Sequence, residues 1–150
     1  MLFLPSFPLF SVLKVRLACF NTDSFTILTA SEHTVKIWDA VLGTVKRIFK
    51  GLVASEITAL CLDDRQRKFI LGESSGVIGV FDYRNGDKMK TFAPQYHLPV
   101  VQLAYSDHAK ALVAAYQDST VSEGVAEEII VVNVGDSTKA HFVSCVCHVY

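Results

Sequence analysis

The sequence Lys36-Ile37-Trp38-Asp39 returns in softened form as Val80-Phe81-Asp82, and the two Asp residues lie 43 positions apart. Three more pairs align at the same spacing without a gap: Ile57-Thr58-Ala59-Leu60 with Val100-Val101-Gln102-Leu103, Ser31-Glu32-His33-Thr34 with Ser74-Ser75-Gly76-Val77, and Gly43 with Gly86. A fixed period of this size is typical of stacked or radial repeat proteins. We therefore expect units of about 43 residues.

Each unit divides into four short segments with the pattern of β-strands. In the first unit, Val35 to Trp38 alternates apolar and polar residues, as a strand with one buried face does. The other strands of this unit are predicted over 13–20, 26–31 and 45–49. The second unit repeats them over 57–62, 69–71, 77–83 and 88–93. Between its last two strands, Asn85-Gly86 predicts a hairpin turn.

The third unit keeps this pattern only in its first half. Strands are predicted over 100–105 and 112–116, and the register fails after Val121. The segment 129–136 has the pattern of the missing third strand, displaced by an insertion near 122–128, with Asn133 at the place of Asp39 and Asp82. The predicted organisation is an unassigned apolar segment (1–12), repeats over 13–50, 56–93 and 99–142, the last one degenerate, and an unassigned tail (143–150).

Composition sets limits on function. Of the 150 residues, 51% are hydrophobic, which excludes disorder of the whole chain. The formal net charge is −1, so the composition gives no indication of a basic surface that would bind nucleic acid. Of the four cysteines, Cys19 and Cys61 lie in alternating apolar runs, where free thiols act as small core side chains. We expect a reducing, cytoplasmic compartment.

The first 13 residues are apolar and are followed by Lys14. They are too few to span a bilayer, and Pro5 and Pro8 would break a helix. A secretory signal is the less favoured alternative because no basic residue precedes the run. We expect no membrane-embedded segment.

No residue group predicts chemistry. Ser106, Asp107 and His108 are consecutive, whereas a catalytic triad needs side chains that converge from separate elements. Cys145, Cys147 and His148 form one cluster, short of the paired ligands of a structural zinc site. The basic turn with Arg65, Arg67 and Lys68 is interpreted as a solvated hairpin tip, with a docking patch as the less favoured alternative. We predict no catalytic, cofactor-binding or metal-binding residue and no cofactor.

Four short strands per unit, with Trp38-Asp39 ending the third strand, resemble the WD-repeat β-propeller family. The resemblance implies an all-β fold of four-stranded antiparallel blades. Because 150 residues provide about three such units, the ring would be incomplete. The chain would then be a fragment of a larger propeller, a truncated product or an unusual short assembly, and we favour the fragment. We expect Trp38 to pack between blades, and uncovered blade edges to permit self-association.

Family members hold each blade with hydrogen bonds among His, Ser or Thr, Asp and Trp. On this chain the resemblance places Glu32, Ser75 and Asp118 at the Asp position, and Leu28, Leu71 and Ala114 at the hydroxyl position. No unit has the whole network. We therefore expect the blades to depend on apolar packing.

A narrower resemblance concerns proteins of cilia and flagella. Glu56 to Leu60, Asp63 to Ile70 and Asn85-Gly86 resemble WD-repeat proteins that also carry EF-hand segments, although this chain has no EF-hand loop. A cilium or flagellum is therefore the alternative location.

These observations favour a non-catalytic scaffold that binds other proteins. In WD-repeat relatives, the turns between second and third strands and the links between blades share one face. The partner-binding candidates on this chain are Glu32, His33, Ser74, Ser75, His97, Asp118 and Ser119. The alternative is a small β-barrel enzyme or ligand-binding domain, which strand pairing would distinguish.

Overall fold

Three four-stranded sheets make up the part of the chain that the computed structural model describes: residues 15–94, 97–107, 111–117, 127–133 and 143–147. Sheet 1 contains β1 (Leu17–Asn21), β2 (Thr26–Ser31), β3 (Thr34–Asp39) and β4 (Val45–Lys50). Sheet 2 contains β5 (Ile57–Leu62), β6 (Lys68–Glu73), β7 (Ile78–Asp82) and β8 (Lys88–Phe92). Sheet 3 contains β9 (Val100–Ser106), β10 (Ala111–Gln117), β11 (Glu127–Asn133) and β12 (Val143–Cys147).

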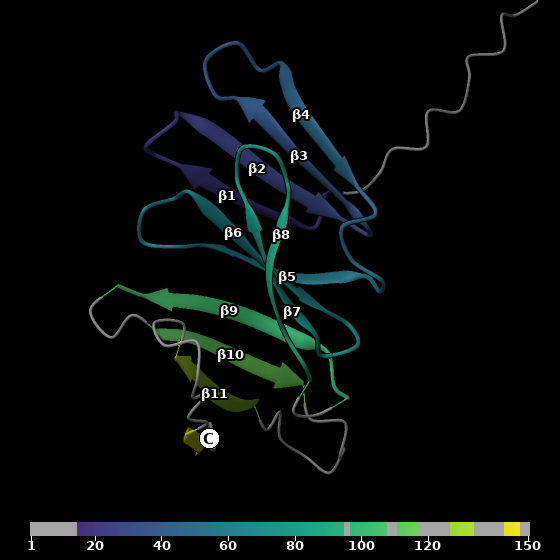
Figure 1. Ribbon diagram of the computed structural model, residues 1–150, viewed down its shortest axis with the longest axis vertical. Coiled ribbons are helices and arrows are strands. Elements are labelled where there is room, and N and C mark those ends of the chain that lie inside the picture. The colour runs from purple at the N-terminus through teal and green to yellow at the C-terminus, as the bar shows by residue number, and fades with distance from the viewer. Residues whose placement is uncertain (1–14, 95–96, 108–110, 118–126, 134–142, 148–150) are drawn as a thin grey trace, which may run out of the picture.

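In each sheet the strands follow one another in chain order, and every neighbouring pair is antiparallel. The three sheets lie one after another (Figure 1). This confirms the predicted all-β fold of four-stranded antiparallel units. It contradicts the β-barrel alternative, because none of the sheets described closes on itself.

The displaced third strand of the last unit is confirmed. Asn133 on β11 pairs with Ala111, as Asp82 pairs with Lys68 in sheet 2 and Asp39 pairs with Thr26 in sheet 1. Asn133 therefore occupies the place of the two aspartates.

Two boundaries differ from the predicted ones. Strand β11 begins at Glu127, inside the segment assigned to the insertion. The fourth strand of sheet 3 is β12, which lies in the segment 143–150 that was left unassigned. Since the preceding segments move β12 away from the 43-residue period, a search by period could not find it. The segment 1–12 and most of the insertion lie outside the described residues.

The repeat is not free of gaps. Asp39 and Asp82 are 43 residues apart, but their partners Thr26 and Lys68 are 42 apart. The extra residue lies in the turn between β6 and β7, which is one residue longer than the turn between β2 and β3. The structural equivalent of Leu71 is therefore Thr29, and not Leu28 as the constant period implied.

Two apolar clusters hold the three sheets together. Between sheets 1 and 2 lie buried residues that include Leu28, Val35, Ile37, Phe69, Leu71 and Phe81. Between sheets 2 and 3 lie others that include Ile70, Ile78, Val80, Leu103, Leu112 and Ala114. The first strands are neighbours, with β5 beside both β1 and β9. Sheet 2 is therefore covered on both faces.

Stacked rings form the centre of the first cluster. Phe69 stacks on Phe49 of β4 at 5.9 Å between ring centroids and on Phe81 at 5.3 Å. The loop after β7 approaches Phe49 closely at Gly86, where a Cβ atom would lie 2.8 Å from the Phe49 ring. Gly86 has a φ of +76°, which favours glycine. The Asn85-Gly86 signal thus predicted the turn, but the loop spans 83–87 and is not a two-residue turn.

Trp38 occupies in sheet 1 the position that Phe81 has in sheet 2. Phe81 is buried against sheet 1, whereas no described sheet packs against Trp38. Because Ile37 points into the cluster between sheets 1 and 2, Trp38 points to the opposite face of sheet 1. It is half-buried there, and its indole N–H donates to Thr29 Oγ1 at 2.8 Å. The expectation that Trp38 packs between blades is therefore wrong for the described chain, since no described sheet covers this face.

The matched positions Phe81 and Trp38 provide a stability test. Phe81→Ala should lower the free energy of unfolding by about 3–5 kcal/mol, because it opens a cavity between two sheets. Trp38→Ala should cost at most about half as much, because a half-exposed ring leaves no closed cavity. Urea denaturation of both variants measures the difference. Equal losses would show that the outer face of sheet 1 is covered.

Candidate functional site

Loops of the described chain gather at two opposite ends of the sheets. The link end carries the β2–β3 and β6–β7 turns and the links between sheets, which are residues 51–56 and the described part of 93–99. The hairpin end carries the β1–β2, β3–β4, β5–β6 and β7–β8 turns. Hydrogen bonds join loops within each end, such as the Ile57 amide to the Glu32 carbonyl at the link end and the Tyr83 amide to the Arg67 carbonyl at the hairpin end.

Glu32 and His33 form the β2–β3 turn and are exposed. The Glu32 carbonyl accepts the Ile57 amide at 2.7 Å, and the His33 carbonyl accepts the Gly51 amide at 3.3 Å. The turn backbone is therefore tied to the link, while both side chains extend outward. His97 is exposed in the next link at the same end.

Ser74 and Ser75 differ in what they do. The Ser75 hydroxyl lies 3.0 Å from the Ser55 hydroxyl, and the Ser75 amide also donates to it. The Ser55 amide and hydroxyl in turn donate to the Glu73 carboxylate, both at 2.9 Å. Within the described ranges, Ser74 forms a hydrogen bond only through its amide, which donates to the Glu56 carbonyl. Ser75 therefore belongs to a polar network, and the Ser74 side chain stays available.

Sequence reasoning missed Glu73, the centre of this network. Its side chain is 3% exposed although it carries a carboxylate, and the Ser55 donors satisfy it. An acidic residue at the end of a buried strand, followed by two serines, was the available signal. Sheet 2 therefore does not depend on apolar packing alone, which corrects the expectation for this unit.

Sheet 1 also retains part of a polar network. The hydrogen bond from Trp38 to Thr29 is the tryptophan–hydroxyl contact that the sequence placed at Leu28. The prediction was wrong by one residue because the period changes from 42 to 43 within the unit. In sheet 3, Tyr116 takes the place of Glu73, and its hydroxyl donates to the Gly76 carbonyl at 3.4 Å.

Five of the seven candidate residues therefore lie at the link end, and Asp118 and Ser119 lie outside the described residues. Within the described ranges, no three His, Cys, Asp or Glu side chains are grouped to hold a metal ion. The same part of the chain contains no helix able to cross a membrane.

Cys19 and Cys61 are free thiols that pack against the two apolar clusters. Burial raises the pKa of Cys19 to about 11 and that of Cys61 to about 12. This confirms their interpretation as small core side chains.

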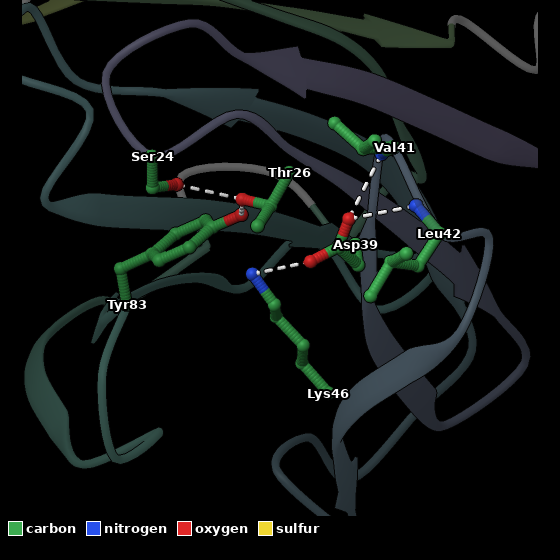
Figure 2. A network of polar contacts seen from close by, with 7 residues as sticks. All are labelled: Ser24, Thr26, Asp39, Val41, Leu42, Lys46 and Tyr83. Atoms are coloured by element: carbon green, nitrogen blue, oxygen red, sulfur yellow. Dashed lines mark hydrogen bonds and ion pairs between the residues drawn. The ribbon is translucent and has the colours of Figure 1, made fainter.

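At the hairpin end, the aspartate of each Trp-Asp or Phe-Asp pair closes a loop. Asp39 Oδ1 accepts the amides of Val41 and Leu42 at 2.8 and 2.9 Å, and its other oxygen lies 2.8 Å from Lys46 Nζ (Figure 2). The Lys46 hydrogen bond, with the two amides, lowers the pKa of Asp39 to about 2. Asp82 accepts the amides two and three residues ahead in the same way.

A cavity of about 560 Å³ opens between sheets 1 and 2 at the hairpin end. Hydroxyls lie along it: the buried Thr26 and Tyr83 hydroxyls are 2.8 Å apart, and the hydroxyl of the exposed Ser24 lies 2.6 Å from that of Thr26 (Figure 2). The β1–β2 and β5–β6 turns are joined beside it, since the Asn21 amide group donates to the Gln66 carbonyl at 2.8 Å. This cavity involves none of the predicted partner-binding residues.

Substitutions of Ser55, Ser75 and Ser74 test which of these hydroxyls stabilise the fold. Ser55→Ala should lower the free energy of unfolding by about 1–2 kcal/mol, because it removes a hydrogen bond to a buried carboxylate. Ser75→Ala should cost about 1 kcal/mol. The control Ser74→Ala should stay within about 0.5 kcal/mol of the wild type. Urea denaturation compares them, and a loss at Ser74 as large as at Ser55 would contradict the network.

No family model matches the chain. Among solved structures, the chain is similar to the β-propeller domain of Myceliophteria thermophila Cps50 (Swd1), with a TM-score of 0.61 and 18% identity. It is also similar to the WD40 repeats of RRP9, with a TM-score of 0.69 and 15% identity. Each comparison covers 88% of this chain and 38% of the solved one.

A sequence relative is the Cilia- and flagella-associated protein 337 B of Tetrahymena thermophila, 27% identical over 109 residues. The match covers 72% of this chain and 9% of that protein. The name of this relative agrees with the ciliary part of the narrower resemblance found in the sequence. Together with the three successive meanders and the two propellers, the geometry shows that the chain has the fold of a WD-repeat β-propeller segment.

Proposed function

We propose that this chain is a non-catalytic scaffold for protein–protein interaction and that its link end contacts the partner. The observation that carries the proposal is the contrast at this end between fixed backbone and free side chains. Hydrogen bonds tie the turn of Glu32 and His33 to the link before β5, yet neither side chain has a partner among the described residues. Rigid turns that present unused polar groups are suited to recognition.

We also propose that the chain is a segment of a larger propeller. The inner face of sheet 1 and both faces of sheet 2 pack against neighbouring sheets, whereas the outer face of sheet 1 leaves Phe20, Val45 and Ile48 between 41% and 50% exposed. A preceding sheet would cover it. In the isolated chain, a second copy would cover it instead. The repeats would then span 13–50, 56–93 and 99–147, the last extended to include β12.

The proposed partners are proteins in the cytoplasm, in a cilium or in a flagellum, with no role for nucleic acid or membrane. The net charge of −1 supports a protein over a nucleic acid partner. The name of the Tetrahymena relative supports the ciliary location.

The test uses proximity labelling by the longer protein that contains this chain, followed by capture of the labelled partner. Glu32→Lys and His97→Glu should each reduce capture, because they reverse or add charge at the link end without touching a buried contact. The matched control is Arg65→Glu, which changes an exposed charge at the hairpin end.

Circular dichroism must show that the three variants keep the wild-type fold. Capture reduced by Glu32→Lys and His97→Glu but not by Arg65→Glu supports the proposal. Capture lost with Arg65→Glu and kept with the other two would place the interaction at the hairpin end and contradict it.

A further inference from the structure

The cavity between sheets 1 and 2 is lined mainly by polar groups of opposite walls. Sheet 1 and its turns contribute Asn21, Asp23, Ser24, Thr26, Ile37, Lys46 and Arg47. Sheet 2 and its turns contribute Gln66, Arg67, Asp82, Tyr83 and Arg84. Since both walls belong to this chain, the cavity does not depend on any further sheet.

Positive charge dominates the lining, with four cationic side chains against two carboxylates. Lys46 is already paired with Asp39. Arg47, Arg67 and Arg84 are exposed, and no carboxylate of the described residues lies within ion-pair distance of their guanidinium groups. Three arginines around one cavity therefore have side-chain donors without an acceptor in the described part of the chain.

The two carboxylates of the lining do not satisfy these arginines. Asp82 uses Oδ1 to close the β7–β8 loop through the amides of Arg84 and Asn85. Asp23 forms no ion pair with a described residue. An incoming anion would thus meet a site with an excess of positive charge.

The hydroxyls that line the cavity add hydrogen-bond donors whose O–H bonds can rotate. In the contacts of Ser24 with Thr26 and of Thr26 with Tyr83, either oxygen can donate. Their hydrogens can therefore reorient toward an acceptor without moving the backbone. A lining that combines exposed arginines with hydroxyls suits carboxylate groups, which accept several hydrogen bonds each.

We propose that this cavity binds an acidic peptide segment of a protein partner. The arginines come from three separate segments, β4 and the β5–β6 and β7–β8 turns, on both walls. Charges distributed in this way match carboxylates spaced along a peptide better than one compact ion. The volume of about 560 Å³ is also within the range that holds several side chains.

The probe is a fluorescein-labelled decapeptide of alternating Glu and Gly, and its neutral counterpart has Gln in place of Glu. Fluorescence anisotropy with the full chain should show binding of the acidic peptide only. Arg67→Gln and Arg84→Gln should each weaken binding roughly tenfold, because each removes a charged hydrogen-bond donor. Affinity should fall as NaCl rises from about 50 to about 300 mM.

The matched control is Arg65→Gln, in the same turn as Arg67 and exposed, but outside the lining. It should leave affinity within about twofold of the wild type, and circular dichroism checks the fold of all variants. Equal weakening by Arg65→Gln, or no binding of the acidic peptide, would overturn the proposal. So would complete displacement of the peptide by inorganic phosphate at a concentration equal to that of the peptide, which would indicate a small-anion site.

This inference does not depend on the link end. Loss of peptide binding in Arg67→Gln with partner capture intact would support the cavity as a separate site. The Glu32→Lys variant, in contrast, should bind the acidic peptide as the wild type does.

Discussion

A sheet that lies between two others in this chain has two apolar faces, and the neighbouring sheets cover them. Sheet 2 shows how this constraint is met. Phe69 and Leu71 point toward sheet 1, while Ile70 and Ile78 point toward sheet 3. Because successive residues of a strand face opposite sides, β5, β6 and β7 each contribute to both interfaces. Stability in such an array comes from contacts between neighbours.

The stacking of sheets also creates the two ends at which we place the proposed binding sites. At the link end, the chain passes from one sheet to the next. Backbone hydrogen bonds and the Glu73 network hold the link 51–56 against the β2–β3 and β6–β7 turns there. Where chain turns back within a sheet, Asp39 and Asp82 close loops of the same shape. One end therefore presents free acidic and imidazole side chains, and the other presents arginines around a cavity.

Most of the fold could be predicted from the sequence because alternation marks strands and the period marks units. The strand Thr26–Ser31 was predicted to the residue, and Asn133 was placed correctly despite the displacement of its strand. Two predictions failed, the hydroxyl position in sheet 1 and the fourth strand of sheet 3, and both failed because a constant period was assumed. A constant period cannot show the extra residue between β6 and β7, and it cannot find β12 after an insertion.

The candidate site was less predictable because its parts meet only in three dimensions. Ser55 and Glu73 are 18 residues apart and belong to a link and a strand. The arginines at 47, 67 and 84 lie on three segments that only the packing of sheet 1 on sheet 2 brings together. Trp38 was misplaced for a related reason: its sequence pattern shows a blade position, but not whether a neighbour is present to cover it.

Backbone hydrogen exchange tests most directly whether neighbouring sheets provide the stability. It should be measured at a concentration where sedimentation shows a monomer. The central strands of sheets 1 and 2 each pair with a strand on both sides, so they differ chiefly in the number of neighbouring sheets that pack against them. The account predicts that amides of β6 and β7 exchange more slowly than those of β2 and β3, because local opening of sheet 2 exposes two interfaces. Exchange in β2 and β3 that is as slow as in β6 and β7 would contradict it.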